Sequence, residues 1–114
     1  MTVDILGTKY ELLIKYDSED AALEDCGGYR DAFAKQIVVA KYKPDGDPTV
    51  TKNLHAVTQQ NIRHEIVHAF LYESGLHANA MKYSGEWPDN EEMIDWFAIQ
   101  GPKIYRAWEK AGAL

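Results

Sequence analysis

The chain has 114 residues, a formal charge of −6 and a pI near 5.1, with 46% hydrophobic and 26% charged residues. This length and composition are those of one ordinary globular domain, spanning residues 1–114, and exclude a disordered or fibrous protein. The lysines are dispersed among acidic and apolar residues. We therefore expect no phosphate-binding face and no nucleic-acid partner.

Cys26 is the only cysteine, which excludes an internal disulfide and a cysteine-rich zinc site and favours a reducing compartment. Asp4, Lys9 and Glu11 lie in the N-terminal region, which therefore does not read as an export leader. No window approaches the roughly 18 consecutive apolar residues of a membrane-spanning helix. We expect a cytoplasmic protein without a membrane partner.

β-forming residues dominate the first third of the chain, and Gly7 and Thr8 interrupt them where a tight turn would join two strands. An acidic segment then ends in a glycine pair and predicts a loop with one helical turn. A second hairpin is expected next, and its last strand is the predicted edge for binding an extended substrate. The predicted elements are strands 2–6, 9–16, 29–34 and 36–42 and a helical turn at 19–25.

The second half of the chain predicts helices. No proline or glycine occurs from about Asn53 to Ser74, and Ile62, Ile66 and Phe70 recur every fourth residue. This spacing predicts a helix over 53–74 with one buried face. Gly75 follows where a helix commonly ends with a left-handed residue.

A last helix is predicted from near Asp89, because Asp89 and Glu92 have the spacing of a capping box. Gly101 and Pro102 are expected to kink or break it. Its predicted apolar side comprises Met93, Ile94, Phe97, Ile104, Tyr105 and Trp108. Strands followed by helices predict an α+β domain, in which a short antiparallel-rich sheet of about four strands packs against both helices.

The string His64-Glu65-Ile66-Val67-His68 lies inside the first predicted helix. Residues four apart on an α-helix differ in direction by about 40°, so the two imidazoles project from one face within reach of one ion. Glu65 would lie beside that face, where its carboxylate can act on water held by the metal. The motif predicts Zn²⁺ on His64 and His68, with Glu65 as general base.

A catalytic zinc ion needs a third protein ligand. Residues 91–95 supply Glu-x-x-x-Asp, with Glu91 or Glu92 as the candidate ligand and Asp95 as support for a ligand histidine. Glu92 has a structural explanation in the predicted capping box, so Glu91 is favoured and Glu92 stays as the alternative. An acidic first turn that only stabilises the helix would also explain both glutamates.

Two segments, RHEIVHAFLYESGL at 63–76 and NEEMIDWFAIQGPKI at 90–104, resemble the minimal gluzincin-like metallopeptidases often encoded by phages and mobile elements. They are more distantly similar to the ImmA/IrrE family, which usually has Asn where this chain has Asp95. The resemblance implies a zincin-like minimal domain, in which a short sheet packs on the HExxH helix and the later acidic helix completes a zinc site. It also implies peptidase ancestry.

The sequence therefore predicts a zinc metallopeptidase that hydrolyses a protein or peptide substrate, and it does not predict an oligomeric state. His77 and Tyr83, between the two helices, are the candidate donors to the oxyanion. Both also read as plain loop residues. The alternative function is a catalytically silent zinc-binding regulatory or interaction domain.

Overall fold

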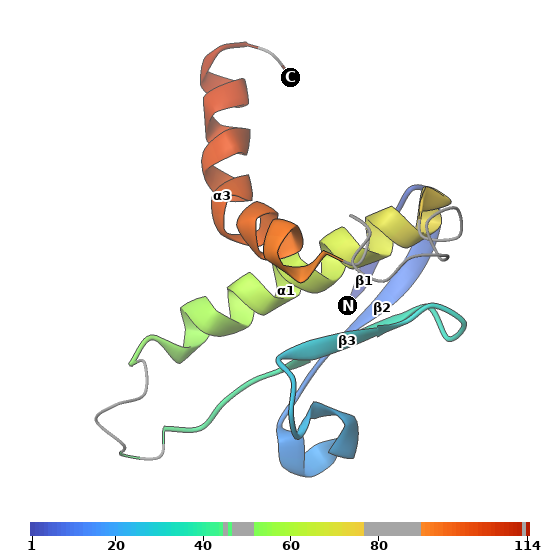
Figure 1. Ribbon diagram of the computed structural model, residues 1–114, viewed down its shortest axis with the longest axis vertical. Coiled ribbons are helices and arrows are strands. Elements are labelled where there is room, and N and C mark those ends of the chain that lie inside the picture. Colours follow the sequence, from blue (N-terminus) through green and yellow to red (C-terminus); the bar gives the residue numbers. More distant parts are fainter. Residues whose placement is uncertain (45, 47–51, 77–89, 113) are drawn as a thin grey trace.

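The computed structural model describes residues 1–44, 46, 52–76, 90–112 and 114, and has a four-stranded sheet and two long helices (Figure 1). The strand order is β1-β2-β4-β3, in which β2 and β4 are parallel and the other two pairings are antiparallel. The predicted α+β class is confirmed, and the sheet is mixed. The strands are β1 Thr2–Ile5, β2 Thr8–Lys15, β3 Gly28–Asp31 and β4 Gln36–Ala40.

The predicted turn between the first two strands is confirmed. Leu6 and Gly7 have φ values of 52° and 87°. Two consecutive left-handed residues give the twist that suits a two-residue hairpin connection. The Asp4 carboxylate accepts a hydrogen bond from the Gly7 N–H at 2.9 Å, which further stabilises the turn.

Strand β4 lies inside the sheet, between β2 and β3. Its run Ile37-Val38-Val39-Ala40 is fully buried because both faces of the sheet are covered. Ile37 and Val39 face α1 (Leu54–Glu73), whereas Val38 and Ala40 pack with Leu23 on the other face. The prediction that this strand offers a free edge is therefore wrong, and β3 is the edge strand on that side of the sheet.

The link from β2 to β3 contains two short 3₁₀ turns, η1 Asp17–Glu19 and η2 Ala21–Leu23, where one helical turn over 19–25 was predicted. Asp20 separates the two turns, and its carboxylate accepts hydrogen bonds from the Ala22 N–H and the Tyr29 hydroxyl. These bonds place Leu23 against the sheet.

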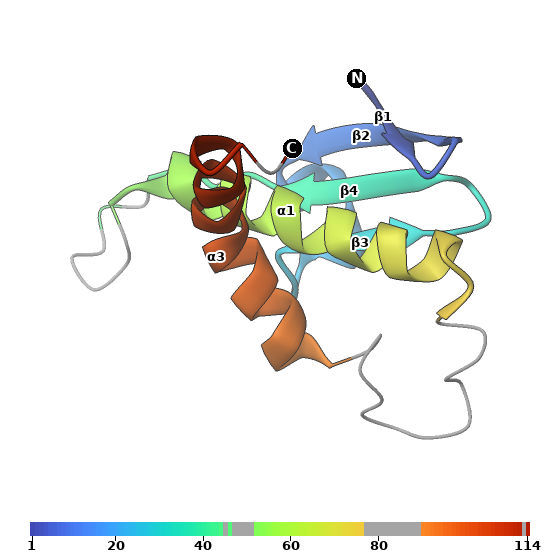
Figure 2. The ribbon, with the colours of Figure 1, turned by 90° about the horizontal axis from the view of Figure 1, so that it is seen from above.

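Helix α1 crosses one face of the sheet (Figure 2). The Asn53 side chain caps its first turn by accepting from the Ala56 N–H, and Gly75 follows its end with φ 83°. Ile62 and Ile66 pack on the core as predicted, but Phe70 is 40% exposed and Ala69 is fully buried instead. At about 100° per residue, position 69 lies within about 20° of position 62, whereas position 70 lies about 80° away.

The last residue of α1, Glu73, ties the helix to the sheet. Its carboxylate accepts from the Tyr10 hydroxyl at 2.6 Å and from Lys35 Nζ at 2.8 Å. Burial, followed by this bond to Glu73, raises the pKa of Tyr10 well above its usual range. The bonds from Lys35 and Tyr10 lower the pKa of Glu73. The position of α1 over the strands is thus fixed at this end.

Helix α3 (Glu91–Lys110) packs mainly against α1, not on the sheet as predicted, and buries Ile94 and Ala98. Asn90 caps it by accepting from the Met93 N–H, so the predicted cap at Asp89 is wrong. Three residues of its predicted apolar side are instead exposed: Phe97, Tyr105 and Trp108. Neither long helix in the described part of the chain has the length and apolarity needed to span a bilayer.

Pro102 lies inside α3, and the helix continues through it, with a change of direction between its two halves (Figure 1). Proline has no N–H, so the carbonyl four residues earlier, that of Ala98, loses its usual helical donor. Arg63 of α1 replaces that donor, because its Nε donates to the Ala98 oxygen. This bond joins the two helices next to His64.

The Arg63 bond predicts a double-mutant cycle. Arg63→Ala should lower the free energy of unfolding by about 1–3 kcal/mol, because it leaves a partly buried carbonyl unsatisfied. In a Pro102→Ala background the N–H of residue 102 can donate to the Ala98 carbonyl. The loss of stability caused by Arg63→Ala should therefore be smaller there by about 1 kcal/mol. Urea denaturation measures both. Arg106→Ala, at an exposed arginine of α3, is the control, and strictly additive effects would contradict the exchange of donors.

Candidate metal centre

His64 and His68 lie one turn apart on α1 and point to the same side. Their Nε2 atoms are 3.1 Å apart and their ring centroids 4.8 Å apart. The i, i+4 spacing brings the rings together, while Ile62 and Ile66 hold the opposite side of the helix on the core. Both side chains are about 15% exposed, so the two rings are held by their surroundings and not free in solvent.

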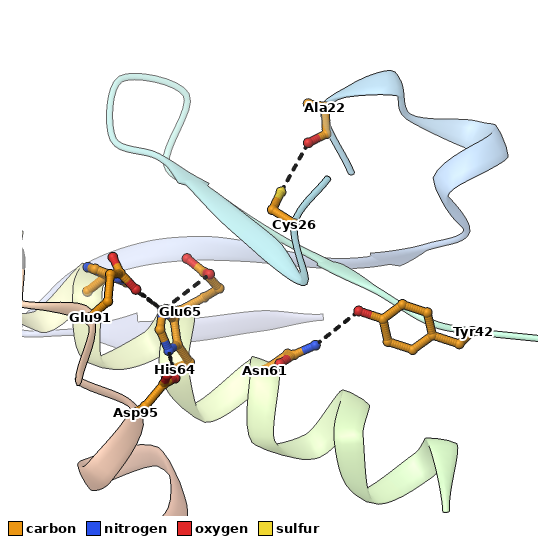
Figure 3. A network of polar contacts seen from close by, with 9 residues as sticks. Ala22, Cys26, Tyr42, Asn61, His64, Glu65, Glu91 and Asp95 are labelled. Carbon is orange, nitrogen blue, oxygen red and sulfur yellow. Dashed lines mark hydrogen bonds and ion pairs between the residues drawn. The ribbon is translucent and has the colours of Figure 1, made fainter. Parts of the chain in front are cut away.

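Glu91, the first residue of α3, meets both rings. Its Oε2 is 2.9 Å from His64 Nε2 and its Oε1 is 3.1 Å from His68 Nε2 (Figure 3). These three side chains form a possible metal-binding group among the described residues. Glu91 itself is 65% exposed, so the third donor enters from the open side of the site.

The donor set fits a zinc ion. In tetrahedral coordination, ligand bonds of about 2.0–2.2 Å place two nitrogen or oxygen ligands about 3.3–3.5 Å apart. The observed separations are 2.9–3.1 Å when each histidine is measured to its nearer Glu91 oxygen, and with one ligand atom per residue the three atoms lie within 4.8 Å of one another. A second argument is electronic, because three atoms with lone pairs converge here and repel one another unless a proton or a cation lies between them.

Asp95 fixes the orientation of His64. Its Oδ1 lies 2.6 Å from His64 Nδ1, so Nδ1 carries the proton and donates to the carboxylate. The lone pair of His64 is then on Nε2, the atom that faces His68 and Glu91. Asp95 lies four residues after Glu91, and the two carboxylates therefore share one face of α3.

Glu92, the alternative ligand, points elsewhere. It lines a separate hollow with Asn90, Met93 and Trp96. The capping argument that favoured Glu91 over Glu92 placed the cap one residue too early, because Asn90 and not Asp89 caps the helix. Glu91 stays the predicted ligand for a different reason, which is that it shares the face of α3 that carries Asp95.

Glu65 is buried beside the histidines, with Oε1 3.9 Å from His64 Nε2. Its pKa is raised to about 7, mainly by burial; the charge of His64 opposes the shift, the charge of Glu91 adds to it, and the charge of Arg30 opposes it. A carboxyl group with a pKa near neutrality suits the exchange of protons in both directions. The side chain has room because residue 28 is a glycine, at which an added Cβ would lie 3.0 Å from Glu65 Cγ.

A cleft of about 570 Å³ connects these groups. Besides the predicted site residues it is lined by residues that the sequence analysis did not assign to the site: Cys26, Gly27, Gly28, Arg30 and Asn61. Cys26 is exposed, and its thiol is directed to the carbonyl of Ala22 and away from the histidines (Figure 3). The glycine pair at the start of β3, Gly27 just before the strand and Gly28 as its first residue, was the one local signal for this wall of the cleft.

His77 and Tyr83, the predicted oxyanion donors, lie outside the described residues. No protein-family model matches the chain, and no curated protein or solved structure matches it significantly.

The raised pKa of Glu65 predicts a pH-dependent stability in the metal-free chain. The pKa of this carboxyl is about 7 in the folded chain and ordinarily 4.5, so the folded state favours the protonated form. Stability from this group is fully present below pH 4.5, falls as the pH rises, and stays low above about 7. At a pH above 7 the charged Glu65 lowers the free energy of unfolding by about 3 kcal/mol, and Glu65→Gln should remove this loss of stability.

The measurement is denaturation in urea with a chelator, at pH 5 and pH 8. From pH 5 to pH 8 the free energy of unfolding of Glu65→Gln should rise relative to that of the unchanged protein. Glu92→Gln alters an exposed glutamate and should show no such gain. Equal pH dependence with and without the Glu65 carboxyl would show that the folded protein does not raise its pKa.

Proposed function

We propose that the chain is a zinc-dependent metallopeptidase of zincin-like architecture. The observation that carries the proposal is the convergence of His64, His68 and Glu91, with Asp95 behind one ring and a buried Glu65 beside it. Three protein ligands leave a fourth position open, as in catalytic zinc sites. The resemblance of both helical segments to small gluzincin-like peptidases supports the same function.

When bound, a zinc ion would acidify a water molecule and polarise the carbonyl of a peptide bond. Glu65 would accept the proton of the attacking water and deliver it to the leaving amine nitrogen. Asp95 would keep the His64 proton on Nδ1 throughout, which holds Nε2 available as a ligand.

The edge strand β3 supports a peptide as the substrate. Residues 27, 28 and 30, at the start of β3 and just before it, line the cleft opposite the histidines. Pairing with only β4 leaves one side of β3 free of a neighbouring strand in the described sheet. An extended peptide could add to that side and pass between β3 and α1.

Metal binding can be tested before activity. Protein loaded with zinc and then desalted should hold about one equivalent by mass-spectrometric metal counting. His64→Ala, His68→Ala and Glu91→Ala should each lose it, because each removes one of three ligands. Asp95→Ala should weaken affinity about 10- to 100-fold, because it frees the His64 ring. Glu92→Ala is the matched control, and loss of zinc from that variant alone would reverse the choice of ligand.

Catalysis is tested with Glu65→Gln. A peptide mixture prepared from a cell proteome, incubated with the zinc-loaded chain, should yield new termini by mass spectrometry. Glu65→Gln should slow their appearance about 10²- to 10⁴-fold while zinc content stays at one equivalent, since the change removes the base and not a ligand. Cleavage that continues unchanged in this variant would overturn the assigned role of Glu65.

A second candidate is a zinc-binding interaction domain without catalysis. The observation that favours it is a set of large apolar side chains that α3 leaves exposed. They are Trp96, Phe97, Ile99, Tyr105 and Trp108, each between 42% and 54% exposed. Aromatic residues of this kind often form the core of protein interfaces. The Glu65→Gln variant separates the candidates, because an interaction domain would keep its function after that change.

A further inference from the structure

Arg30 is a cation in the cleft that the proposed mechanism does not use. The register of β3 pairs it with Ile37, whose side chain lies in the core beneath α1, so Arg30 points to the same face of the sheet. Its Cζ lies 4.7 Å from the ring centroid of Tyr72, on α1. The guanidinium is therefore held along the wall of the cleft that contains His64 and His68.

Two of the three guanidinium nitrogens of Arg30 lack a hydrogen-bond partner among the residues that the structure describes. Its Nε and Nη1 atoms are buried without a hydrogen-bond partner there. Three carboxylates line the cleft: Glu91 meets the two imidazoles, Asp95 meets His64 Nδ1, and Glu65 interacts with Arg30 through charge, but none of them accepts a hydrogen bond from Arg30 Nε or Nη1. A buried, charged donor without an acceptor is unfavourable. A ligand with a suitable acceptor would relieve that state.

We propose that Arg30 binds a carboxylate of the peptide substrate and thereby sets the specificity of the cleft. The proposal rests on the proposed peptidase function. A guanidinium matches a carboxylate because its planar N–H groups can donate two parallel hydrogen bonds. The amide of Asn61, which also lines the cleft, is neutral and offers no competing positive charge. Arg30 is thus the side chain suited to an anionic substrate group.

The position of Arg30 also sets how far that carboxylate lies from the bond to be cut. Tyr72, over which Arg30 stacks, is one helical turn after His68, a rise of about 6 Å. An extended peptide advances about 3.3 Å per residue, so the carboxylate would lie about two residues from the metal-binding group. Two sources fit this distance: a free C-terminal carboxylate, or the side chain of an Asp or Glu near the cleavage site.

The test is the binding of three kinds of fluorescein-labelled hexapeptide that share one neutral sequence. The first ends in an amide, the second ends in a free carboxylate, and the third is an amide with one Gln replaced by Glu at each inner position in turn. Fluorescence anisotropy measures their affinity for the full chain carrying Glu65→Gln, with zinc and with a chelator. This background prevents cleavage during the measurement.

At least one carboxylate probe should bind 10-fold or more tightly than the neutral amide, and the preferred probe identifies the source. Adding Arg30→Gln should abolish the difference and leave the affinity of the neutral amide unchanged. Lys35→Gln is the matched control, because Lys35 lies over the same Tyr72 ring but is already paired with Glu73. It removes the same charge and should keep the preference.

Equal binding of all probes, or a preference that survives Arg30→Gln, would overturn the proposal. If Arg30→Gln does not fold, as judged by circular dichroism, Arg30→Lys decides the matter. Lysine keeps the charge but cannot form the paired hydrogen bonds, so the preference should fall several-fold, and full retention would count against it. Hydrolysis is measured separately with Glu65 intact. A carboxylate preference without hydrolysis would therefore contradict the peptidase function and not the role of Arg30. Hydrolysis without a carboxylate preference would contradict the role of Arg30 and not the peptidase function.

Discussion

The crossing of α3 over α1 brings the candidate site together, and one hydrogen bond to a backbone carbonyl holds the two helices beside it. Pro102 deprives the Ala98 oxygen of its helical donor, and Arg63 supplies the replacement from the residue just before His64. At about 100° per residue, positions 91, 95 and 98 lie within about 60° of one another on α3. The stripe that buries Ala98 against α1 therefore also brings Glu91 and Asp95 to the histidines. The packing of α3 against α1 therefore also assembles the candidate site.

The second constraint is the burial of an ionisable group. Glu65 projects from α1 towards the start of β3, where a glycine leaves room for it. Burial raises its pKa to about 7 and so disfavours its charged form in the metal-free protein. A hydrophobic residue at position 65 would stabilise the fold more, because burial of a carboxylate is unfavourable without full compensation. This local loss of stability is typical of a functional site and unusual for a structural one.

The features that the sequence predicted correctly are those that depend on residues close by in the chain. The placement of His64 and His68 follows from i, i+4 spacing, and the start and end of α1 follow from a Pro-free and Gly-free segment. Prediction from the sequence failed where the outcome depends on distant segments. The parallel pairing of β2 with β4, the edge position of β3 and the proximity of Arg30 to α1 all depend on the strand order, which no local pattern specifies. Phe70 was misplaced because a four-residue repeat drifts around the helix.

The two halves of the metal-binding group differ in how firmly they are held. His64 and His68 are about 15% exposed on a helix packed against the sheet, whereas Glu91 is 65% exposed at the first turn of α3, next to residues outside the described part. An ion shared by both helices would add bonds between elements that are otherwise joined by the bonds of Arg63 to Ala98 and of His64 to Asp95 and by the burial of Ile94 and Ala98. Because linkage is reciprocal, metal binding favours the docked position of α3 by the same factor by which docking of α3 raises metal affinity. Contacts on α3 far from the ligands can therefore alter occupancy of the site without touching it.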